Sequence, residues 1–460
     1  MREGQTGGDT RGSRLNLRRW LTPGIGVKRW LLVVFAGLLL LALGVAHLIR
    51  QATQDIQPGG LARALIDLVT LQFLPFQLRG LVVAVAGVAL VGVGAYRLVL
   101  ALTEPFRSAS DGPLVELIYQ KRFLARGPRI VAIGGGTGLS TLLRGLKEHT
   151  SNLTAVVAVA DDGGSSGVLR EELGIPPVGD IRRCIAALAD AEPLMSELLQ
   201  YRFPGNTDDQ TLEGGGALGG HAVGNLLIAA MTAVEGGDFE EGLRQMNRVL
   251  AVRGQVVPAT ATPLTLHAEL ADGTVVDGQS AIAKVASISR AWVTPTDVRA
   301  SEDAIAAIAE AELIVLGPGS LYTSLLPSLL LPEIRDAIAA SSALKVFVCN
   351  VATQPGETTG FDLSDHVEAL VAHAGLDVAD VVLGNNQFGA RVAPGYANEA
   401  VRLRWPPSVT PAPRLALEDV VDPTNGHHHD PARLAAALIG MYEKEGGGRK
   451  RSGGSVARTA

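Results

Sequence analysis

The sequence predicts an α/β fold in which helices cover both faces of a mostly parallel sheet, preceded by two transmembrane helices. Three observations predict it. Short apolar runs without polar alternation recur along the chain and end in glycine-rich or polar loops, as strands buried on both faces do. Amphipathic helical patterns separate several of these runs. Two uncharged apolar stretches precede them, each close to the length needed to cross a bilayer.

The two apolar stretches are predicted to span the membrane at about residues 30–49 and 80–96. Basic residues cluster before the first and after the second, whereas the intervening loop has few. The positive-inside rule therefore places both termini and the main domain in the cytoplasm. A cleaved signal peptide is the alternative for the first stretch, but it lacks an obvious small-residue cleavage site and a second stretch follows. We predict a multi-pass cell-membrane anchor over residues 1–127, in contact with lipid.

The main domain is predicted over residues 128–445. It begins with a strand at Ile130–Ile133, a glycine turn and an amphipathic helix, and a second strand follows at Leu153–Ala160. Three later runs repeat the pattern of strand and polar loop: Leu313–Ser320, Leu344–Asn350 and Val381–Asn386. Ligands bind beyond the carboxyl ends of strands in open parallel sheets, and the distinctive loops of this sequence all follow such ends.

Two segments depart from the alternating pattern. Between Val256 and Val293, polar alternation around an Asp272-Gly273 turn predicts a small β insertion. Residues 430–444 are typical of a closing helix, and the Gly/Ser/Arg-rich residues 446–460 are predicted to be a disordered tail.

Composition excludes some functions. The net charge is −6 and charged residues make up 19% of the chain, so no basic face for broad nucleic-acid binding is expected. The two cysteines, Cys184 and Cys349, cannot form a disulfide framework or a cysteine-rich metal site. The main domain is therefore expected to be intracellular.

The glycine turn after the first strand is a candidate phosphate-binding loop, formed by Gly135, Gly136, Thr137 and Gly138. Glycines let the backbone approach a phosphate, and the start of a helix offers free N–H groups. The dinucleotide fingerprint fails because Leu139 stands at its last glycine, and a Walker A loop fails because no lysine precedes the hydroxyl residue. A tight turn without a ligand is the alternative.

Carboxylates follow the second strand. Asp161 and Asp162 could hold Mg²⁺, contact a ribose, or cap the next helix. Asp180 could act in the site or simply be the N-cap of a helix predicted from Ile181 to Asp190.

A second glycine turn, Gly317-Pro318-Gly319, is followed by the hydroxyl residues Ser320 and Thr323. Facing the first turn, it would form a second anion nest suited to a diphosphate or a phosphorylated substrate. Residues 350–359 add amides and hydroxyls that can recognise a base or sugar, although Pro355-Gly356 equally fits an ordinary turn.

Histidines carry less weight. His221 and Asn225 lie one helical turn apart and could present donors to a ligand, but a lone helical histidine is more often structural. The run His427–His429 resembles a metal-binding tract. Its proline-flanked position without matching ligands predicts a solvated loop instead.

Eight separated motifs together resemble one family. They are GGGTGLSTLLRGLKE, VVAVADDGGSSGVLREELG, PPVGDIRRC, LLQYRF, GHAVGNLLIAA, VLAVRGQVVPAT, LGPGSLYTSLLP and VCNVATQPGETTGF. In this order they resemble the YvcK-type gluconeogenesis factors of the CofD-like superfamily. The resemblance covers about Arg129 to Met441 and leaves out the two predicted membrane helices.

The resemblance implies a Rossmann-like nucleotide-binding domain that binds a UDP-sugar, notably UDP-N-acetylglucosamine. It also implies a role in cell shape and peptidoglycan precursor supply during gluconeogenic growth, with no firmly implied reaction. The related CofD branch transfers a phospholactyl group with Mg²⁺ near the carboxylates that correspond to Asp161 and Asp162. Carried over by motif, the first turn would meet the phosphates. Further residues would line the rest of the cleft: Asn225, Gly319, Ser320, Thr323, Asn350 and Gln354.

Two functions therefore compete. One is a membrane-tethered, non-catalytic UDP-sugar sensor that acts through a protein partner in cell-wall synthesis. The other is a Mg²⁺-dependent transferase of phosphorus-containing groups, using Asp161 and Asp162. A dehydrogenase is disfavoured by the broken dinucleotide fingerprint. A homodimer is a further expectation for a parallel-sheet protein, but no segment of the sequence locates its interface.

Overall fold

The computed structural model describes residues 123–189, 192–204, 218–389 and 398–445, together with a few single residues before 123. The chain divides into two units, Met1–Arg122 and Phe123–Ala460, and the second contains the main domain. The predicted membrane helices and tail lie outside the described residues. Within the described part of the chain, no helix has both the length and the apolar character that crossing a membrane requires.

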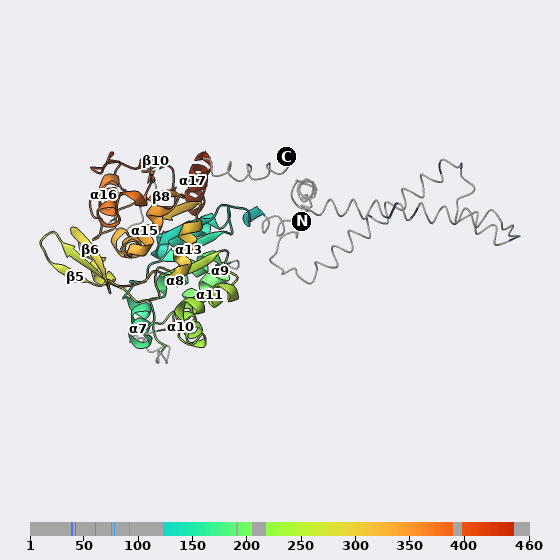
Figure 1. Ribbon diagram of the computed structural model, residues 1–460, viewed down its shortest axis with the longest axis horizontal. Coiled ribbons are helices and arrows are strands. Elements are labelled where there is room, and N and C mark those ends of the chain that lie inside the picture. The colour runs from blue at the N-terminus through green and yellow to red at the C-terminus, as the bar shows by residue number, and fades with distance from the viewer. Residues whose placement is uncertain are drawn as a thin grey trace, which may run out of the picture. The chain divides into compact units, whose positions relative to one another are not determined.

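A seven-stranded sheet forms the centre of the main domain (Figure 1). Its strands, in the order β10-β9-β8-β7-β1-β2-β3, all pair in parallel. Their bounds are β1 Ile130–Gly134, β2 Leu153–Val157, β3 Gln255–Pro258, β7 Leu313–Leu316, β8 Leu344–Val348, β9 Val381–Asn385 and β10 Arg414–Glu418. The predicted α/β class and mostly parallel sheet are confirmed. β3 and β10 are strands that were not predicted, and β3 belongs to the main sheet rather than to the β insertion.

Helices connect the strands and form two layers. In the first layer, α6 contacts both α8 and α17. The second layer contains α13, α14, α15 and α16. The helical elements are α6 Gly136–Leu146, α7 Gly164–Leu173, α8 Gly179–Leu188, α9 Glu192–Gln200, α10 Val223–Val234, α11 Phe239–Val249, α12 Gln279–Ile282, α13 Glu302–Glu310, η2 Leu321–Leu325, α14 Leu326–Leu329, α15 Pro332–Ala340, α16 Leu363–Ala374, η3 Leu376–Val378 and α17 Pro431–Lys444.

Helix α6 shows why these segments form amphipathic helices. Leu139, Leu142, Leu143 and Leu146 lie at helical spacing and are fully buried, as their pattern predicts. Burial of one such side chain stabilises the fold by roughly 1.5–3 kcal/mol. The α6 helix is thereby held firmly between β1 and the helices α8 and α17.

The strand order places a switch point between β1 and β7. From β1 the chain proceeds to β2 and β3 on one side, and from β7 it proceeds to β8, β9 and β10 on the other. In a doubly wound sheet the connections that leave such neighbouring strands go to opposite faces, which opens a crevice at their carboxyl ends. The topology thus points to the loops after Gly134 and after Leu316.

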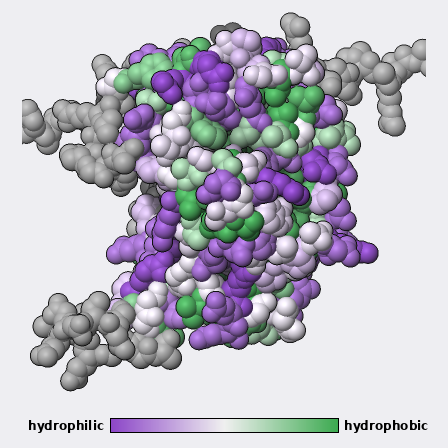
Figure 2. Space-filling model, turned by 90° about the vertical axis from the view of Figure 1, so that its left-hand side faces the viewer, coloured by the Kyte–Doolittle hydropathy of each residue, from purple (hydrophilic) through white to green (hydrophobic). Residues whose placement is uncertain are grey.

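The predicted β insertion is confirmed as a three-stranded antiparallel sheet in the order β5-β4-β6. It comprises β4 Thr265–Leu270, β5 Val275–Asp277 and β6 Ile288–Thr294. Gly273 in the connecting turn has a φ of +84°, which favours glycine. In Figure 1 the strands β5 and β6 project from the body, and the same side of the molecule in Figure 2 is mostly hydrophilic with small separate hydrophobic areas.

Candidate functional site

A cavity of about 250 Å³ opens at the carboxyl ends of β1, β7 and β8. It lies at the topological switch point, where the fold predicts a ligand crevice. Its lining residues are Gly135, Gly136, Thr137, Gly138, Thr141, Pro318, Gly319, Ser320, Ser324, Asn350, Val351, Ala352, Gln354, Asn398, His427, His428 and His429. Most of the nucleotide-binding residues predicted from the sequence therefore share one cavity.

The first glycine turn leaves N–H groups free for an anion. Helix α6 begins after Gly135 without a side-chain cap, and its first backbone bond runs from the Leu139 N–H to the Gly135 carbonyl. The N–H groups of Thr137 and Gly138 thus have no acceptor within the helix. These groups and the helix dipole form a site suited to phosphate.

Close packing explains why this turn is made of glycines. A Cβ added at Gly138 would lie 2.5 Å from the Pro318 carbonyl oxygen, and one at Gly135 would lie 2.5 Å from the carboxylate of Asp180. Gly136 has a φ of +66°, a region that side chains disfavour. The two glycine turns therefore pack directly against each other.

Asp180 contacts the first glycine turn through its buried carboxylate. It lies in the first turn of α8 rather than at the predicted N-cap, and it is buried. Its carboxylate accepts hydrogen bonds from the Gly136 N–H and from Arg183 at 2.6 Å. Burial raises the pKa of Asp180, and Arg183 opposes this shift. The ion pair with Arg183 limits the repulsion that this carboxylate would exert on a phosphate in the turn.

The carboxylates predicted to bind a metal lie outside the cavity lining. Asp161 Oδ1 accepts a hydrogen bond from its neighbour Gly163 N–H at 3.0 Å. Asp162 Oδ1 accepts one from Ser280 N–H at 2.8 Å, which ties this loop to α12 of the β insertion. Among the residues that the structure describes, no group of three or more histidine, cysteine, aspartate or glutamate side chains could hold a metal ion.

The second glycine turn is held by side-chain amides. Asn350 accepts the Gly319 N–H at 3.3 Å and donates to the Gly319 carbonyl at 2.9 Å. Gln354 donates to the Ser320 hydroxyl at 2.6 Å. Gly317 adopts a φ of +78° beneath the turn and does not line the cavity.

Thr323 does not reach the cavity either. It lies in the π-helix η2, is buried, and donates from its hydroxyl to Glu357 Oε1 at 2.6 Å. The same carboxylate accepts the Tyr322 N–H at 3.2 Å. The N–H groups predicted to form a second anion nest are therefore largely taken by the chain's own side chains.

Asn225 is likewise separated from the cavity. It is 1% exposed, and its amide donates to the Ser165 hydroxyl at 3.0 Å. That hydroxyl also lies 3.1 Å from His221 Nδ1. The buried position of His221 supports its structural interpretation, and these contacts join the starts of α7 and α10.

The three histidines of the cavity lining lie in a strand rather than in the solvated loop that the sequence predicts. His427–His429 form β12 (Asn425–His429), paired with β11 (Val421–Asp422), so the prediction of a solvated loop was wrong. Burial lowers the pKa of His429 to about 4, and its Nε2 donates to the Cys349 carbonyl at 3.3 Å. The Asp422–Asn425 turn between two short runs is the signal that could have indicated this hairpin.

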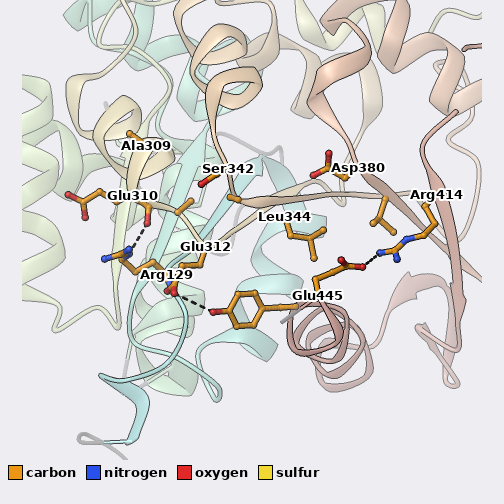
Figure 3. Close-up of a pocket in the computed structure, with 13 residues that line it drawn as sticks. Arg129, Ala309, Glu310, Glu312, Ser342, Leu344, Asp380, Arg414 and Glu445 are labelled. Atoms are coloured by element: carbon orange, nitrogen blue, oxygen red, sulfur yellow. Dashed lines mark hydrogen bonds and ion pairs between the residues drawn. The ribbon is translucent and has the colours of Figure 1, made fainter. Parts of the chain in front are cut away.

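A larger cavity, of about 630 Å³, lies at the opposite ends of the strands, where β8, β9 and β10 begin (Figure 3). Several of its polar groups are already paired within the chain. Arg129 donates to the Glu310 carbonyl at 2.7 Å, and Arg414 pairs with Glu445 at 2.5 Å. The smaller cavity is the better candidate because it carries the free helix N–H groups and lies at the carboxyl edge.

Comparison with known proteins agrees with this fold. Residues 130–403 match the family model described as 2-phospho-L-lactate transferase CofD. A crystal structure of a UPF0052 family protein from Bacillus halodurans superposes with a TM-score of 0.61 at 41% identity, covering 68% of this chain and 99% of that one. A likeness at this identity supports the whole architecture of the main domain.

Sequence relatives extend the comparison. The gluconeogenesis factor of Bacillus subtilis (strain 168) is 49% identical over 265 residues, which cover 57% of this chain and 80% of the relative. The gluconeogenesis factor of Halalkalibacterium halodurans is 48% identical over 272 residues, which cover 59% of this chain and 81% of the relative. A relative from Nostoc sp. is 43% identical over 432 residues, 92% of each chain. With its parallel sheet, its paired glycine turns and these relatives, the chain belongs to the gluconeogenesis factors of the CofD family.

Proposed function

We propose that this chain binds a nucleoside diphosphate sugar, with UDP-N-acetylglucosamine as the first candidate, at the carboxyl edge of its sheet. Through this ligand it would regulate cell shape and peptidoglycan precursor supply during gluconeogenic growth. The observation that carries the proposal is the uncapped start of α6, where the N–H groups of Thr137 and Gly138 face a cavity at the topological switch point.

The remaining lining suits the neutral parts of such a ligand. Asn350, Gln354 and Ser320 offer amide and hydroxyl groups that can bind sugar hydroxyls. The cavity volume of about 250 Å³ is below the usual range for a whole drug-sized ligand, roughly 300–1,000 Å³. We therefore assign the cavity to the diphosphate and the groups next to it, with part of the nucleotide lying across its mouth.

A Mg²⁺-dependent transferase is the second candidate, because the matching family model carries that description. Its fit to this site is poorer. The described lining contains no carboxylate, whereas Mg²⁺ prefers carboxylate and phosphate oxygens. Asp161 and Asp162 lie outside the lining and accept backbone N–H groups of Gly163 and Ser280. Binding without catalysis is the function that the site favours.

Membrane attachment and a protein partner complete the proposal. The two apolar stretches at about 30–49 and 80–96 would tether the domain, and a protein of cell-wall synthesis would receive the signal. The tether rests on the apolar stretches and the basic residues that flank them, and the partner rests on the family resemblance. Membrane fractionation of cells that express the full chain tests the tether, and recovery of the chain in the soluble fraction would contradict it.

Calorimetry of the full chain in detergent micelles tests the ligand. UDP-N-acetylglucosamine is titrated with and without Mg²⁺, and UDP serves as the comparison ligand. Gly138→Ala should weaken binding at least tenfold, because the new Cβ would lie 2.5 Å from the Pro318 carbonyl oxygen. Gly440→Ala in α17 is the matched control, since its Cβ would meet nothing within 4 Å.

The outcomes separate the two candidates. Absence of binding by the unchanged chain would overturn the sensor function. Turnover of a nucleotide-linked donor that requires Mg²⁺ and is abolished by Asp162→Asn would instead establish the transferase. Circular dichroism melting of Gly138→Ala shows whether a loss of binding reflects unfolding.

A further inference from the structure

A buried carboxylate lies directly behind the second glycine turn. Glu357 is 3% exposed, and both of its oxygens accept hydrogen bonds from the start of η2. Oε1 accepts the Thr323 hydroxyl at 2.6 Å, and Oε2 accepts the Tyr322 N–H at 3.2 Å. The Thr323 N–H also contacts this carboxylate. Glu357 thus receives the donors that a helical segment normally presents to an anion.

The two glycine turns consequently differ in charge. At the first turn, the N–H groups of Thr137 and Gly138 have no acceptor within α6. At the second, Glu357 already supplies the negative charge, and the Gly319 N–H is accepted by Asn350. The groups that this side presents to the cavity are the Ser320 and Ser324 hydroxyls and the Gln354 amide, which are neutral, whereas the histidines of the lining come from β12.

We propose that Glu357 is a specificity-determining positioning residue, whose carboxylate fills the anion nest of the second turn and makes that half of the cavity select an uncharged group. The inference rests on the proposed function and refines it. The preferred ligand is then a nucleoside diphosphate joined to a neutral sugar. A nucleotide-linked uronic acid or a nucleoside triphosphate would bring a further negative charge toward Glu357 and bind more weakly.

The surroundings of Glu357 make its charge responsive to pH. Burial raises the pKa of Glu357, and its three donors oppose that shift. Among the described residues whose bonds to its carboxylate are known, the titratable one is Tyr322, whose own pKa is raised to about 12 by burial and by Glu357. Behind the Tyr322 ring lies His373, in an edge-to-face contact with centroids 5.7 Å apart. Protonation of Glu357 at lower pH would remove the negative charge beneath the second turn.

A pair of ligands that differ in one charge tests the proposal. UDP-glucose and UDP-glucuronic acid share every group except the hydroxymethyl or carboxylate at C6. The ratio of their dissociation constants is measured by calorimetry on the full chain, unchanged and with Glu357→Gln. We expect the unchanged chain to prefer UDP-glucose and the variant to show a preference about tenfold smaller. That is the order expected for two charges roughly 10 Å apart at an effective dielectric constant of about 20.

Two control variants separate charge from packing. Thr323→Ser removes a buried methyl group but keeps the hydroxyl that donates to the carboxylate, so the ratio should remain that of the unchanged chain. Glu310→Gln removes an equal charge at the opposite edge of the sheet and should also leave the ratio unchanged. Should Glu357→Gln fail to fold, the unchanged chain still tests the proposal. Its ratio should fall as the pH falls, while the uronic acid stays ionised above about pH 5. The cavity lining also carries His427 and His428, so the fall should persist in a His427→Gln/His428→Gln variant, and a fall that disappears in that variant would overturn the role of Glu357.

The possible failures are distinguishable. Absence of binding of either nucleotide sugar overturns the proposed function and this inference with it. Binding of both without discrimination leaves the proposed function standing and overturns the role of Glu357. The same conclusion follows if Glu357→Gln weakens both ligands equally, or if the ratio in the unchanged chain does not change with pH, because Glu357 would then be a structural residue only.

Discussion

Replacing Gly145 by alanine tests whether the packing of α6 on α17 fixes the position of the phosphate-binding turn. Gly145 lies in the last turn of α6 and faces Pro431 and Ala435 of α17. An added Cβ would overlap the Pro431 carbonyl oxygen, and it would lie 2.7 Å from the Pro431 carbonyl carbon and 2.8 Å from the Ala435 Cβ. Ordinary carbon contacts are about 3.5–4.0 Å, and the overlap with the carbonyl oxygen is larger still, so the two helices must separate by more than roughly 1 Å.

The magnitude follows from two opposing effects. Overpacking of a dense core costs about 1–3 kcal/mol, and a clash with backbone falls toward the upper end. Alanine in place of glycine in a helix returns up to about 1 kcal/mol. We therefore expect Gly145→Ala to lower the free energy of unfolding by about 1–2 kcal/mol. Gly440→Ala, whose Cβ meets nothing within 4 Å, should raise it by about 0.5–1 kcal/mol.

Urea unfolding of the full chain, followed by circular dichroism, measures both effects. Gly145→Ala should also weaken binding of UDP-N-acetylglucosamine, because a shift of α6 displaces the N–H groups of Thr137 and Gly138 at its other end. If Gly145→Ala were as stable as Gly440→Ala, the close approach of the helices would not constrain α6, and the reasoning would be refuted.

Two further predictions concern His429 and Asp162. Burial lowers the pKa of His429 to about 4, so below about pH 6.5 the unfolded chain binds a proton that the folded chain does not. The free energy of unfolding should fall by about 2 kcal/mol from pH 7 to pH 5. His429→Gln should remove this part of the pH dependence, as measured by urea unfolding at each pH. Asp162→Ala leaves the Ser280 N–H without its acceptor, and the lost hydrogen bond is worth about 1 kcal/mol. Hydrogen exchange at the Ser280 amide should therefore be about fivefold faster. Asp272→Ala, at a turn of the same insertion, is the control, and unchanged exchange at Ser280 in Asp162→Ala would contradict the contact.

The strands that the sequence predicts are those buried on both faces. β1, β2 and β9 are continuous apolar runs whose residues are all buried, so their pattern alone reveals them. β10 is different, because its Arg414–Glu418 segment is largely exposed and lies at an edge of the sheet. Only pairing with β9 makes it a strand. A pattern of side chains cannot reveal such an element, since its backbone partner comes from the tertiary fold.

The same distinction applies to the site. Gly135–Gly138 and Gly319–Ser320 are predictable because each follows a buried strand, and the carboxyl ends of parallel strands meet at one edge. Glu357 is not predictable in this way. Its contact with Thr323 joins residues 34 positions apart through side-chain geometry. His427–His429 reach the cavity on a hairpin whose place depends on the preceding fold.

The two glycine turns show why a local motif does not determine its own chemistry. Both follow a buried strand and both open a helical segment, so the sequence assigns an anion nest to each. Asp180 accepts one N–H of the first turn and leaves those of Thr137 and Gly138 available. Glu357 accepts the corresponding donors of the second turn, from Tyr322 and Thr323. Anion capacity therefore depends on which N–H groups the tertiary structure leaves free, and here that capacity lies at the first turn.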